Sequence, residues 1–295
     1  MTRCLVVAEL GVNHNGSREV LLGLVHAAAE SGADAVKIQT RTPEMHADPL
    51  AMRLSCTTMD PREMVSELTH RRRLELSDDD LAAMDAECKR VGIAWFSSCW
   101  DLPSIERIRP YAPKWWKLAS ASSTDLELVR ATRRAANETG ATVIASTGAT
   151  SEEECDRLMA VLGNDRTVLL HCVMGYPVDN DMLNALVMLT LGKRYGCAVG
   201  YSGHERGVQV SASMVAMGAA ARFLMPGLPW GPAVIERHIT LDRSMRGSDH
   251  AASLEPSGFA QLVRDVRAIE SAMGDGVKRV LPSEEREAKR LRRSP

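Results

Sequence analysis

Two lysines and three serines lie at the ends of short apolar runs in the sequence, where a strand would end. Lys37 and Lys117 belong to two of these runs, and Ser120, Ser146 and Ser202 follow or close others. Lysine supplies positive charge and serine supplies hydrogen-bond donors, so the set suits a phosphate or a carboxylate. Gathered at one edge of a sheet, these five residues would form an anion cradle. For either lysine alone, an exposed strand-end charge is the simpler interpretation.

Two histidines close further apolar runs. His204 ends the run YSGH and His238 ends the run ERH. Two imidazoles with a carboxylate and open water positions suit a divalent transition metal ion. Two separate, hydrogen-bonded histidines remain the alternative. Glu9 ends the first apolar run, and we interpret it as a catalytic or substrate-binding carboxylate, as a partner for Lys37, or as both.

Three other histidines have simpler explanations. His14 and His250 stand in turn-rich segments, and we expect them to order loops through hydrogen bonds. His171 directly precedes Cys172 in an apolar run. Neighbouring side chains of a strand point to opposite faces, so this pair does not form a nucleophile–base dyad. We expect a structural role for His171.

Eight short apolar runs alternate with longer amphipathic stretches along the chain. Continuous apolar strands that alternate with helices indicate a parallel sheet covered on both faces. Eight such units favour an α/β fold of the (β/α)8 TIM-barrel type, in which the carboxyl ends of the strands line one functional mouth. The predicted strands are Cys4–Glu9, Ala35–Gln39, Ile93–Ser97, Trp115–Ala119, Thr142–Ser146, Val168–His171, Ala198–Tyr201 and Val234–His238. The predicted helices are Arg18–Ser31, Ser77–Val91, Leu102–Arg109, Asp125–Thr139, Ser151–Gly163, Asn180–Arg194, Gly207–Ala221 and Glu255–Met273.

Three stretches depart from this alternation of strands and helices. Residues 41–76 are too long for a simple loop and are predicted to form an excursion over the barrel mouth. Residues 222–231 form an insert rich in proline and glycine. We expect the barrel to occupy residues 1–275 and a charged tail to occupy 276–295, with a frayed segment or a short exposed helix from residue 282. A solvated tail is favoured over one that touches RNA or an anionic surface.

The overall composition excludes several classes of protein. The 36 basic and 38 acidic residues give a net charge of -2, which argues against nucleic-acid binding through bulk charge. No apolar run approaches the roughly 18 residues of a membrane span, and the first ten residues resemble a strand more than a signal peptide. The seven cysteines are scattered without a CxxC pair. They fit buried, reduced thiols in a cytoplasmic protein.

Eight motifs, in order, resemble the sialic acid synthase family: AELGVNHNG, GADAVKIQT, KLASAS, IASTGAT, LLHCVMGYP, VGYSGH, VIERHITLD and DHAASLEP. The resemblance runs from about Val6 to Arg293. It implies a barrel that condenses phosphoenolpyruvate with an open-chain sugar aldehyde, to give a 3-deoxy-2-ketoacid and phosphate. It also implies a divalent metal, usually manganese with magnesium as the alternative, and a homodimer.

The same resemblance implies roles for individual residues. Glu9 lies near the reacting carbons, Tyr176 and Asp249 face the acceptor, and His204 and His238 bind the metal. Glu236 supports the strand end that carries His238. The residues that would hold phosphoenolpyruvate are Lys37, Gln39, Lys117, Ser120, Ser146 and Ser202.

The sequence departs from the family pattern at four places. Ser122 and Gly203 stand where the family has a Glu and an Asp, and Met174 stands where it has an Asn. The family's STPF motif is replaced by Ser97–Trp100. The phosphoenolpyruvate and metal positions keep the family's residues while acceptor positions differ, which predicts an acceptor other than N-acetylmannosamine.

The final residues resemble the linker that precedes an antifreeze-like domain in the family. That domain lends an arginine to the partner's acceptor site, so its absence would remove one more acceptor contact. Two alternatives to the synthase remain: a metal-dependent pyruvate aldolase or lyase, and a non-catalytic barrel that binds a ligand or a partner. The first would not need two lysines and several serines aimed at a phosphate.

Overall fold

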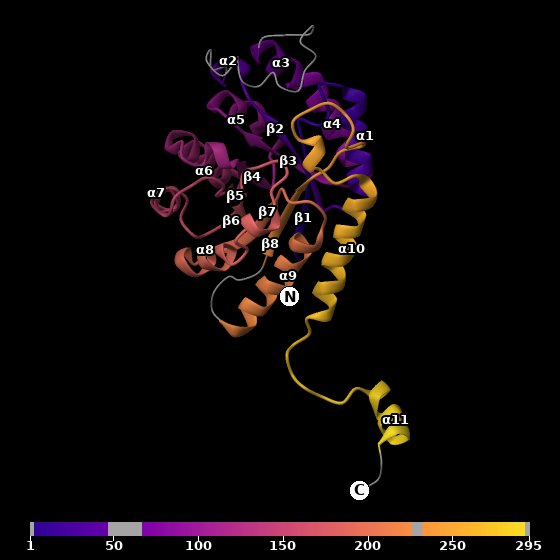
Figure 1. The fold of residues 1–295 in the computed structure, drawn as a ribbon. Coiled ribbons are helices and arrows are strands. Elements are labelled where there is room, and N and C mark those ends of the chain that lie inside the picture. The colour runs from indigo at the N-terminus through magenta and orange to yellow at the C-terminus, as the bar shows by residue number, and fades with distance from the viewer. Residues whose placement is uncertain (1–2, 47–66, 226–231, 293–295) are drawn as a thin grey trace.

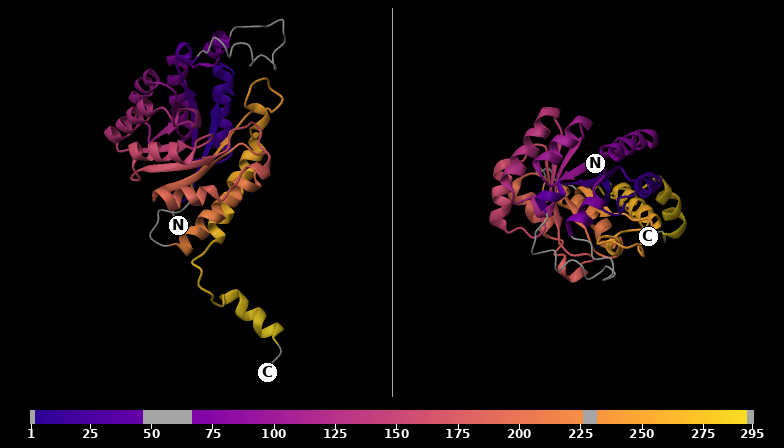
Figure 2. Two further views of the ribbon diagram at one scale, coloured as in Figure 1. Left: turned by 60° about the vertical axis from the view of Figure 1, so that its left-hand side comes forward. Right: turned by 90° about the horizontal axis from the view of Figure 1, so that it is seen from above.

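The structure is a computed structural model that describes residues 3–46, 67–225 and 232–292. Eight parallel strands close into a barrel in chain order, and helices surround it (Figures 1 and 2). The predicted (β/α)8 barrel and its eight strands are therefore confirmed, with ends shifted by one or two residues. The strands are β1 (Leu5–Gly11), β2 (Ala35–Thr40), β3 (Ala94–Cys99), β4 (Trp115–Leu118), β5 (Thr142–Ser146), β6 (Thr167–Cys172), β7 (Ala198–Gly203) and β8 (Pro232–His238).

The surrounding helices begin at residues that cap them. Ser77 and Ser151 each form a reciprocal capping box with the acidic residue three positions on, Asp80 and Glu154. These caps satisfy backbone N–H groups that a helix start leaves without partners. The helices of the barrel layer are α1 (Arg18–Glu30), α4 (Asp78–Val91), α5 (Leu102–Ile108), α6 (Leu126–Thr139), α7 (Glu152–Leu162), α8 (Val187–Tyr195), α9 (Gln209–Leu224) and α10 (Pro256–Ala272).

The predicted helix over residues 180–194 was wrong in its first half. Only a 3-10 turn forms at Asn180–Met182, and α8 begins at Val187. Two features interrupt the helix. The carbonyl of Leu183 lies 2.7 Å from His171 Nε2, which donates to it, and Asn184 has a φ of 46°, outside the right-handed helical region.

Two other irregular stretches are partly described. Helices α2 (Pro43–His46) and α3 (Glu67–Leu74) belong to the predicted excursion at 41–76 and lie at the mouth end of the barrel (Figure 1). Residues 47–66 lie outside the described residues. The insert predicted at 222–231 begins later than expected, because α9 continues to Leu224. Its residues 226–231 also lie outside the described part.

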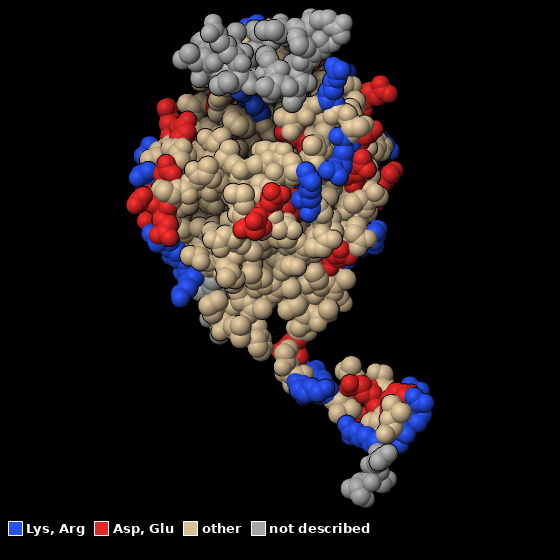
Figure 3. Space-filling model, in the orientation of Figure 1, with Lys and Arg blue, Asp and Glu red and all other residues tan. Residues whose placement is uncertain are grey.

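The tail leaves the barrel and ends in helix α11 (Pro282–Leu291), which stands apart from the other elements (Figure 1). Both signs of charge cover it in the space-filling view (Figure 3). Arg290 pairs with Glu287 and Arg279 pairs with Asp275. A surface of mixed charge fits the solvated tail that the sequence favoured. Among the described residues, no helix combines the length and apolar character needed to cross a bilayer.

Alternation along the strands divides the core into two clusters. The smaller cluster fills the barrel interior and consists of Val7, Ala35, Phe96, Ile144, Val168, Leu170 and Val234. The larger cluster lies between the strands and the helices. Side chains of a strand point alternately to its two faces. The next inward-pointing residue toward the mouth therefore stands two positions further along each strand. Seven of these residues are polar, Glu9, Lys37, Ser98, Lys117, Ser146, Ser202 and Glu236, and the eighth, on β6, is Cys172.

Gly200 lies in a close contact between β7 and its neighbouring strands and gives a test of the barrel packing. A Cβ at Gly200 would lie 2.3 Å from the carbonyl oxygen of Val234 and 2.8 Å from a methyl group of Leu170. We expect Gly200→Ala to lower the free energy of unfolding by about 1–3 kcal/mol, the usual cost of overpacking. Gly258→Ala in α10 is the control, because its Cβ would meet nothing closer than 3.7 Å. Equal urea midpoints for the two variants would contradict this packing.

Candidate active site

A buried cluster of charges occupies the carboxyl-terminal end of the barrel. Lys37 Nζ on β2 lies 2.8 Å from Glu9 Oε2 on β1 and 3.7 Å from Glu236 Oε1 on β8. Lys37 Nζ also donates to Ser98 Oγ at 2.9 Å. Burial lowers the pKa of Lys37, but Glu236 and Glu9 outweigh it and raise that pKa above its usual value. The lysine therefore remains charged between two carboxylates.

Lys117 on β4 has a different environment. Its Nζ donates to Ser146 Oγ at 2.7 Å and to the carbonyl of Leu118 at 2.9 Å. Burial lowers the pKa of Lys117, which Glu236 counteracts in part. Within the described residues, the hydrogen bonds of this ammonium group go to neutral oxygens. Lys117 is thus a buried cation suited to meet a negatively charged ligand.

The remaining serines of the predicted anion cradle lie around these two lysines. Ser202 Oγ on β7 donates to Glu236 Oε1 at 3.1 Å. Ser120 stands in the 3-10 turn Ser120–Ser122 after β4, and its Oγ accepts from the backbone N–H of Gly148 at 3.0 Å. Burial raises the pKa of Cys172 on β6, while Ser120, Lys117 and Ser202 lower it, so this thiol faces the cradle. Cys172 was missed as a site residue, although alternation along its strand predicts that it points inward.

Gln39 connects the cradle to the rim of the mouth. Its Nε2 donates to Glu9 Oε1 at 2.9 Å, and its Oε1 accepts from Arg41. The Arg41 guanidinium lies 4.3 Å over the ring of Trp100 and pairs with Glu75 at 3.2 Å. Arg41 was not predicted as a site residue, because the position of a side chain just beyond a strand end depends on how the following loop folds.

Gly11 allows Glu9 and Asp249 to approach each other. Its φ is +53°, and a Cβ there would lie 3.3 Å from both Asp249 Oδ2 and Glu9 Oε1. Asp249 Oδ2 in turn lies 3.4 Å from His238 Nδ1. The predicted acceptor-facing carboxylate therefore borders both the charge cluster and the histidines.

The two predicted metal-binding histidines do meet. The ring centroids of His204 and His238 are 5.5 Å apart, and the ring of Tyr176 stacks 4.2 Å from His204. His204 Nδ1 lies 3.0 Å from the carbonyl of Val173, which can only accept, so Nδ1 carries the proton and Nε2 keeps its lone pair. Burial and the neighbouring His238 lower the pKa of His204 to about 4. A neutral imidazole with a free Nε2 is the form that binds a metal.

This donor set fits a catalytic cation better than a structural one. Among the residues described, no group of three His, Cys, Asp or Glu side chains converges closely enough to hold an ion by itself. Two imidazoles, with Asp249 beside one of them, would leave other coordination positions for water and substrate. Open positions of this kind are what a catalytic metal site requires.

Other polar residues noted in the sequence lie outside the site. Ser97 points away from the barrel interior and its Oγ lies 2.7 Å from Thr40 Oγ1. The structural role predicted for His171 is confirmed by its bond to Leu183. His14 Nδ1 accepts from the N–H of Gly16 at 3.1 Å, and His250 Nδ1 lies 2.7 Å from Thr240 Oγ1. Both histidines order loops, as expected.

Two departures from the family pattern lie on one wall of the mouth. Ser122 is buried after β4, and Met174 after β6 is 48% exposed. A Cβ on Gly148 would lie 2.7 Å from Ser120 Oγ and 3.0 Å from Met174 Cγ, so the Met174 side chain reaches the cradle. Behind it lies a cavity of about 410 Å³, lined in part by Thr147, Val173 and Leu191. Its lining also includes Thr150, Glu152 and Arg194, so it mixes polar and apolar side chains, and Met174 adds an apolar surface beside the cradle.

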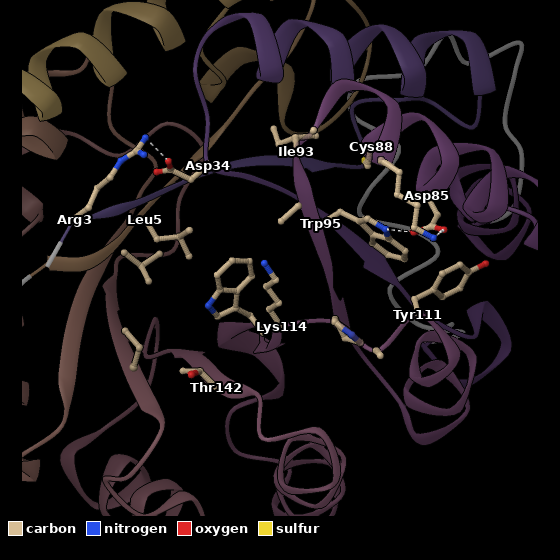
Figure 4. Close-up of a pocket in the computed structure, with 18 of the residues that line it drawn as sticks. Arg3, Leu5, Asp34, Asp85, Cys88, Ile93, Trp95, Tyr111, Lys114 and Thr142 are labelled. Carbon is tan, nitrogen blue, oxygen red and sulfur yellow. Dashed lines mark hydrogen bonds and ion pairs between the residues drawn. The ribbon is translucent and has the colours of Figure 1, made fainter.

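A larger cavity of about 810 Å³ lies at the opposite end of the barrel (Figure 4). Its lining includes residues that begin strands, such as Leu5 and Thr142, together with Lys114 and the Arg3–Asp34 ion pair. The amino-terminal face of such a barrel normally serves stability. The buried charges and the paired histidines lie at the other end, and we therefore place the site at the mouth.

Comparison with known proteins identifies the family. Residues 24–278 match the profile of the NeuB family. The chain belongs to the NeuB family. It is 32% identical to the N,N'-diacetyllegionaminic acid synthase of Campylobacter jejuni, over 100% of this chain and 84% of the relative. It is 31% identical to the human N-acetylneuraminate-9-phosphate synthase, over 95% and 74% of the two chains.

Solved structures agree with this assignment. The N-acetylneuraminic acid synthetase of Leptospira borgpetersenii superposes with a TM-score of 0.77 at 25% identity, covering 99% of this chain and 94% of that one. This member of the NeuB family is thus a phosphoenolpyruvate-dependent, carbon–carbon bond-forming enzyme of the sialic acid synthase type. The family assignment favours the synthase over the aldolase and the non-catalytic barrel.

The two lysines differ in their partners, which predicts different effects on stability. Lys37→Met would leave the carboxylates of Glu9 and Glu236 buried without their cation, and we expect a loss of about 3–5 kcal/mol of unfolding free energy. Lys117→Met would leave neutral hydrogen-bond acceptors without a donor and would remove a favourable charge from Glu236, which keeps Lys37 beside it, at a cost of about 1–3 kcal/mol. Urea denaturation of both variants measures the difference. A larger loss for Lys117→Met would contradict this distribution of charge.

Proposed function

We propose that this NeuB family member condenses phosphoenolpyruvate with a sugar-like aldehyde other than N-acetylmannosamine. The products are a 3-deoxy-2-ketoacid and phosphate. The observation that carries the proposal is the mouth of the barrel. Lys117 lies there, bonded to neutral oxygens, beside three serine hydroxyls, and the imidazoles of His204 and His238 face the same space.

The buried side chains can perform distinct parts of this reaction. Lys117, Lys37 and the serines hold the phosphate and carboxylate of phosphoenolpyruvate through charge-assisted hydrogen bonds. The methylene carbon of phosphoenolpyruvate attacks the aldehyde carbon, water adds to the resulting cationic centre, and the C–O bond to phosphate breaks. The cradle stabilises the negative charge of the departing phosphate throughout.

Glu9 is held by two donors and is placed to orient the reacting groups. Lys37 and Gln39 each occupy one of its carboxylate oxygens. A carboxylate so fixed can stabilise positive charge at the carbon that water attacks. It can also orient that water.

A divalent cation, manganese or magnesium, would be held by His204 and His238. When bound, it supplies Lewis-acid polarisation of the aldehyde oxygen. Asp249 and Tyr176 border the two histidines, so we propose that both contact the acceptor. Their positions next to the rings support this role.

The apolar side chain of Met174 beside the cradle supports an altered acceptor. N-acetylmannosamine presents several hydroxyls, and each hydroxyl that meets no polar partner in a closed site costs about 1–3 kcal/mol. Ser122 and Met174 replace polar groups that could have paired with them. We therefore propose a less hydroxylated, acylamino-substituted aldehyde, a class to which the diacetylated product named for the C. jejuni relative points.

We also propose a cytoplasmic location and a homodimer. The described cysteines are free and buried, which suits a reducing compartment. The dimer is supported by the family resemblance alone.

The metal assignment predicts that bound manganese and turnover are lost together. His204→Ala and His238→Ala should each remove bound manganese and turnover together, since either change deletes one of two imidazole ligands at the mouth. Plasma emission spectroscopy of the dialysed protein measures the metal content. His250→Gln is the control, because this buried histidine orders a loop and should leave the metal content unchanged. Full manganese occupancy in both alanine variants would rule out the assignment.

The acceptor proposal predicts that replacing Met174 changes the enzyme's preference among aldehyde acceptors. Met174→Asn should raise kcat/KM for N-acetylmannosamine at least about tenfold, the scale of one hydrogen bond to a sugar hydroxyl, relative to less hydroxylated hexoses. Phosphate release from a panel of aldehydes measures both. Met182→Asn, at a 68% exposed position, is the control. Efficient turnover of N-acetylmannosamine by the unaltered chain, with other aldehydes inert, would refute the altered acceptor and leave the synthase assignment standing.

A further inference from the structure

A buried ion pair lies directly behind the two histidines of the site. Arg237 on β8 and Glu205, just after β7, are both fully buried, with 2.9 Å between Arg237 Nη1 and Glu205 Oε1. Each is the chain neighbour of a site histidine: Glu205 follows His204 and Arg237 precedes His238. Because side chains alternate along β8, Arg237 points outward while His238 points into the barrel.

This ion pair has nearly all of its hydrogen bonds satisfied. Glu205 Oε1 accepts from Ser211 Oγ at 2.6 Å, and Oε2 accepts from Tyr201 Oη at 2.8 Å. The guanidinium of Arg237 also donates to the carbonyls of Gly207 at 2.8 Å and of Glu205 itself at 2.6 Å. A guanidinium that bonds both the side chain and the backbone of Glu205 fixes the chain immediately beyond His204.

Gly203 explains why the carboxylate stands at position 205. Gly203 is the register partner of Arg237 in the β7–β8 ladder. A Cβ at Gly203 would lie 2.5 Å from Glu205 Oε2, 2.6 Å from a ring carbon of Tyr201 and 2.9 Å from Ser211 Oγ. The Glu205 carboxylate therefore fills the space that a side chain at 203 would occupy, and it does so beside Arg237.

We propose that the Glu205–Arg237 ion pair positions His204 and His238 relative to each other. Both residues act through the histidines and touch no reacting atom. The inference rests on the proposed role of these histidines as metal ligands.

Backbone contacts show how the ion pair can hold both rings. The carbonyl of His204 accepts from the N–H of Val178 at 3.1 Å, and the carbonyl of His238 accepts from that of Leu254 at 2.9 Å. Each histidine is tied to its own loop, and the ion pair links the two chain segments directly through side chains. Loss of that link would let the two strand ends shift independently.

The test compares Glu205→Gln and Arg237→Met with the control Asp34→Asn. The control breaks another partly buried ion pair, with Arg267, at the far end of the barrel. Manganese affinity is measured by titration at a temperature where all variants are folded. We expect a loss of about 10- to 100-fold in both ion-pair variants, the usual effect of removing a group that orients a metal ligand, and no loss in the control. Affinity for phosphoenolpyruvate without metal should stay the same in all three.

Hydrogen exchange of the metal-free protein separates this inference from the proposed function. Glu205→Gln should speed amide exchange at residues 203–206 and 236–239 and leave β2 and β3 unchanged. Unchanged exchange at both segments, or manganese affinity equal to that of Asp34→Asn, would overturn the positioning role. If the unaltered chain binds no manganese while Glu205→Gln still shows the exchange effect, the metal assignment alone is refuted.

Discussion

The burial of Lys37 between two carboxylates is the interaction on which the rest of the site depends. Isolated charges are very costly to bury, and they persist inside a protein only when partners compensate them. Glu9, Lys37 and Glu236 come from β1, β2 and β8, which meet only because the barrel closes. Glu9 is the register partner of Lys37 on one side and of His238 on the other. Closure of the fold and assembly of the site are therefore one event.

Strand alternation explains how much could be predicted from sequence. The strands were recognisable from their apolar runs, and a period of two then places Glu9, Lys37, Lys117 and Ser146 at one mouth. The same rule could have separated Ser98, which faces the site, from Ser97, which does not. Contacts after the strand ends could not be predicted, because they depend on how loops fold back. Examples are Arg41 on Trp100, the carbonyl of Leu183 that ends a predicted helix early, and Glu205 filling the space beside Gly203.

The mouth divides into two halves with different relations to the family pattern. The half formed by β1, β2, β7 and β8 carries the charge cluster and the histidines. Behind the histidines, Glu205 and Arg237 form a fully buried ion pair. The half formed by β3 to β6 carries Lys117 and Ser146 of the cradle, together with the departures at Ser97–Trp100, Ser122 and Met174. A site that keeps its phosphate-binding charges and changes neighbouring acceptor positions is suited to one reaction on a different aldehyde.

Binding of phosphoenolpyruvate by the buried charges at the mouth underlies the proposed reaction. A crystal structure of the chain grown with phosphoenolpyruvate would show where this ligand binds. We expect the ligand phosphate within hydrogen-bond distance of Lys117 Nζ and Ser146 Oγ, with Lys37 still paired to Glu9. Phosphoenolpyruvate bound instead in the cavity at the opposite end, against Arg3 and Lys114, with the mouth unchanged, would contradict this placement.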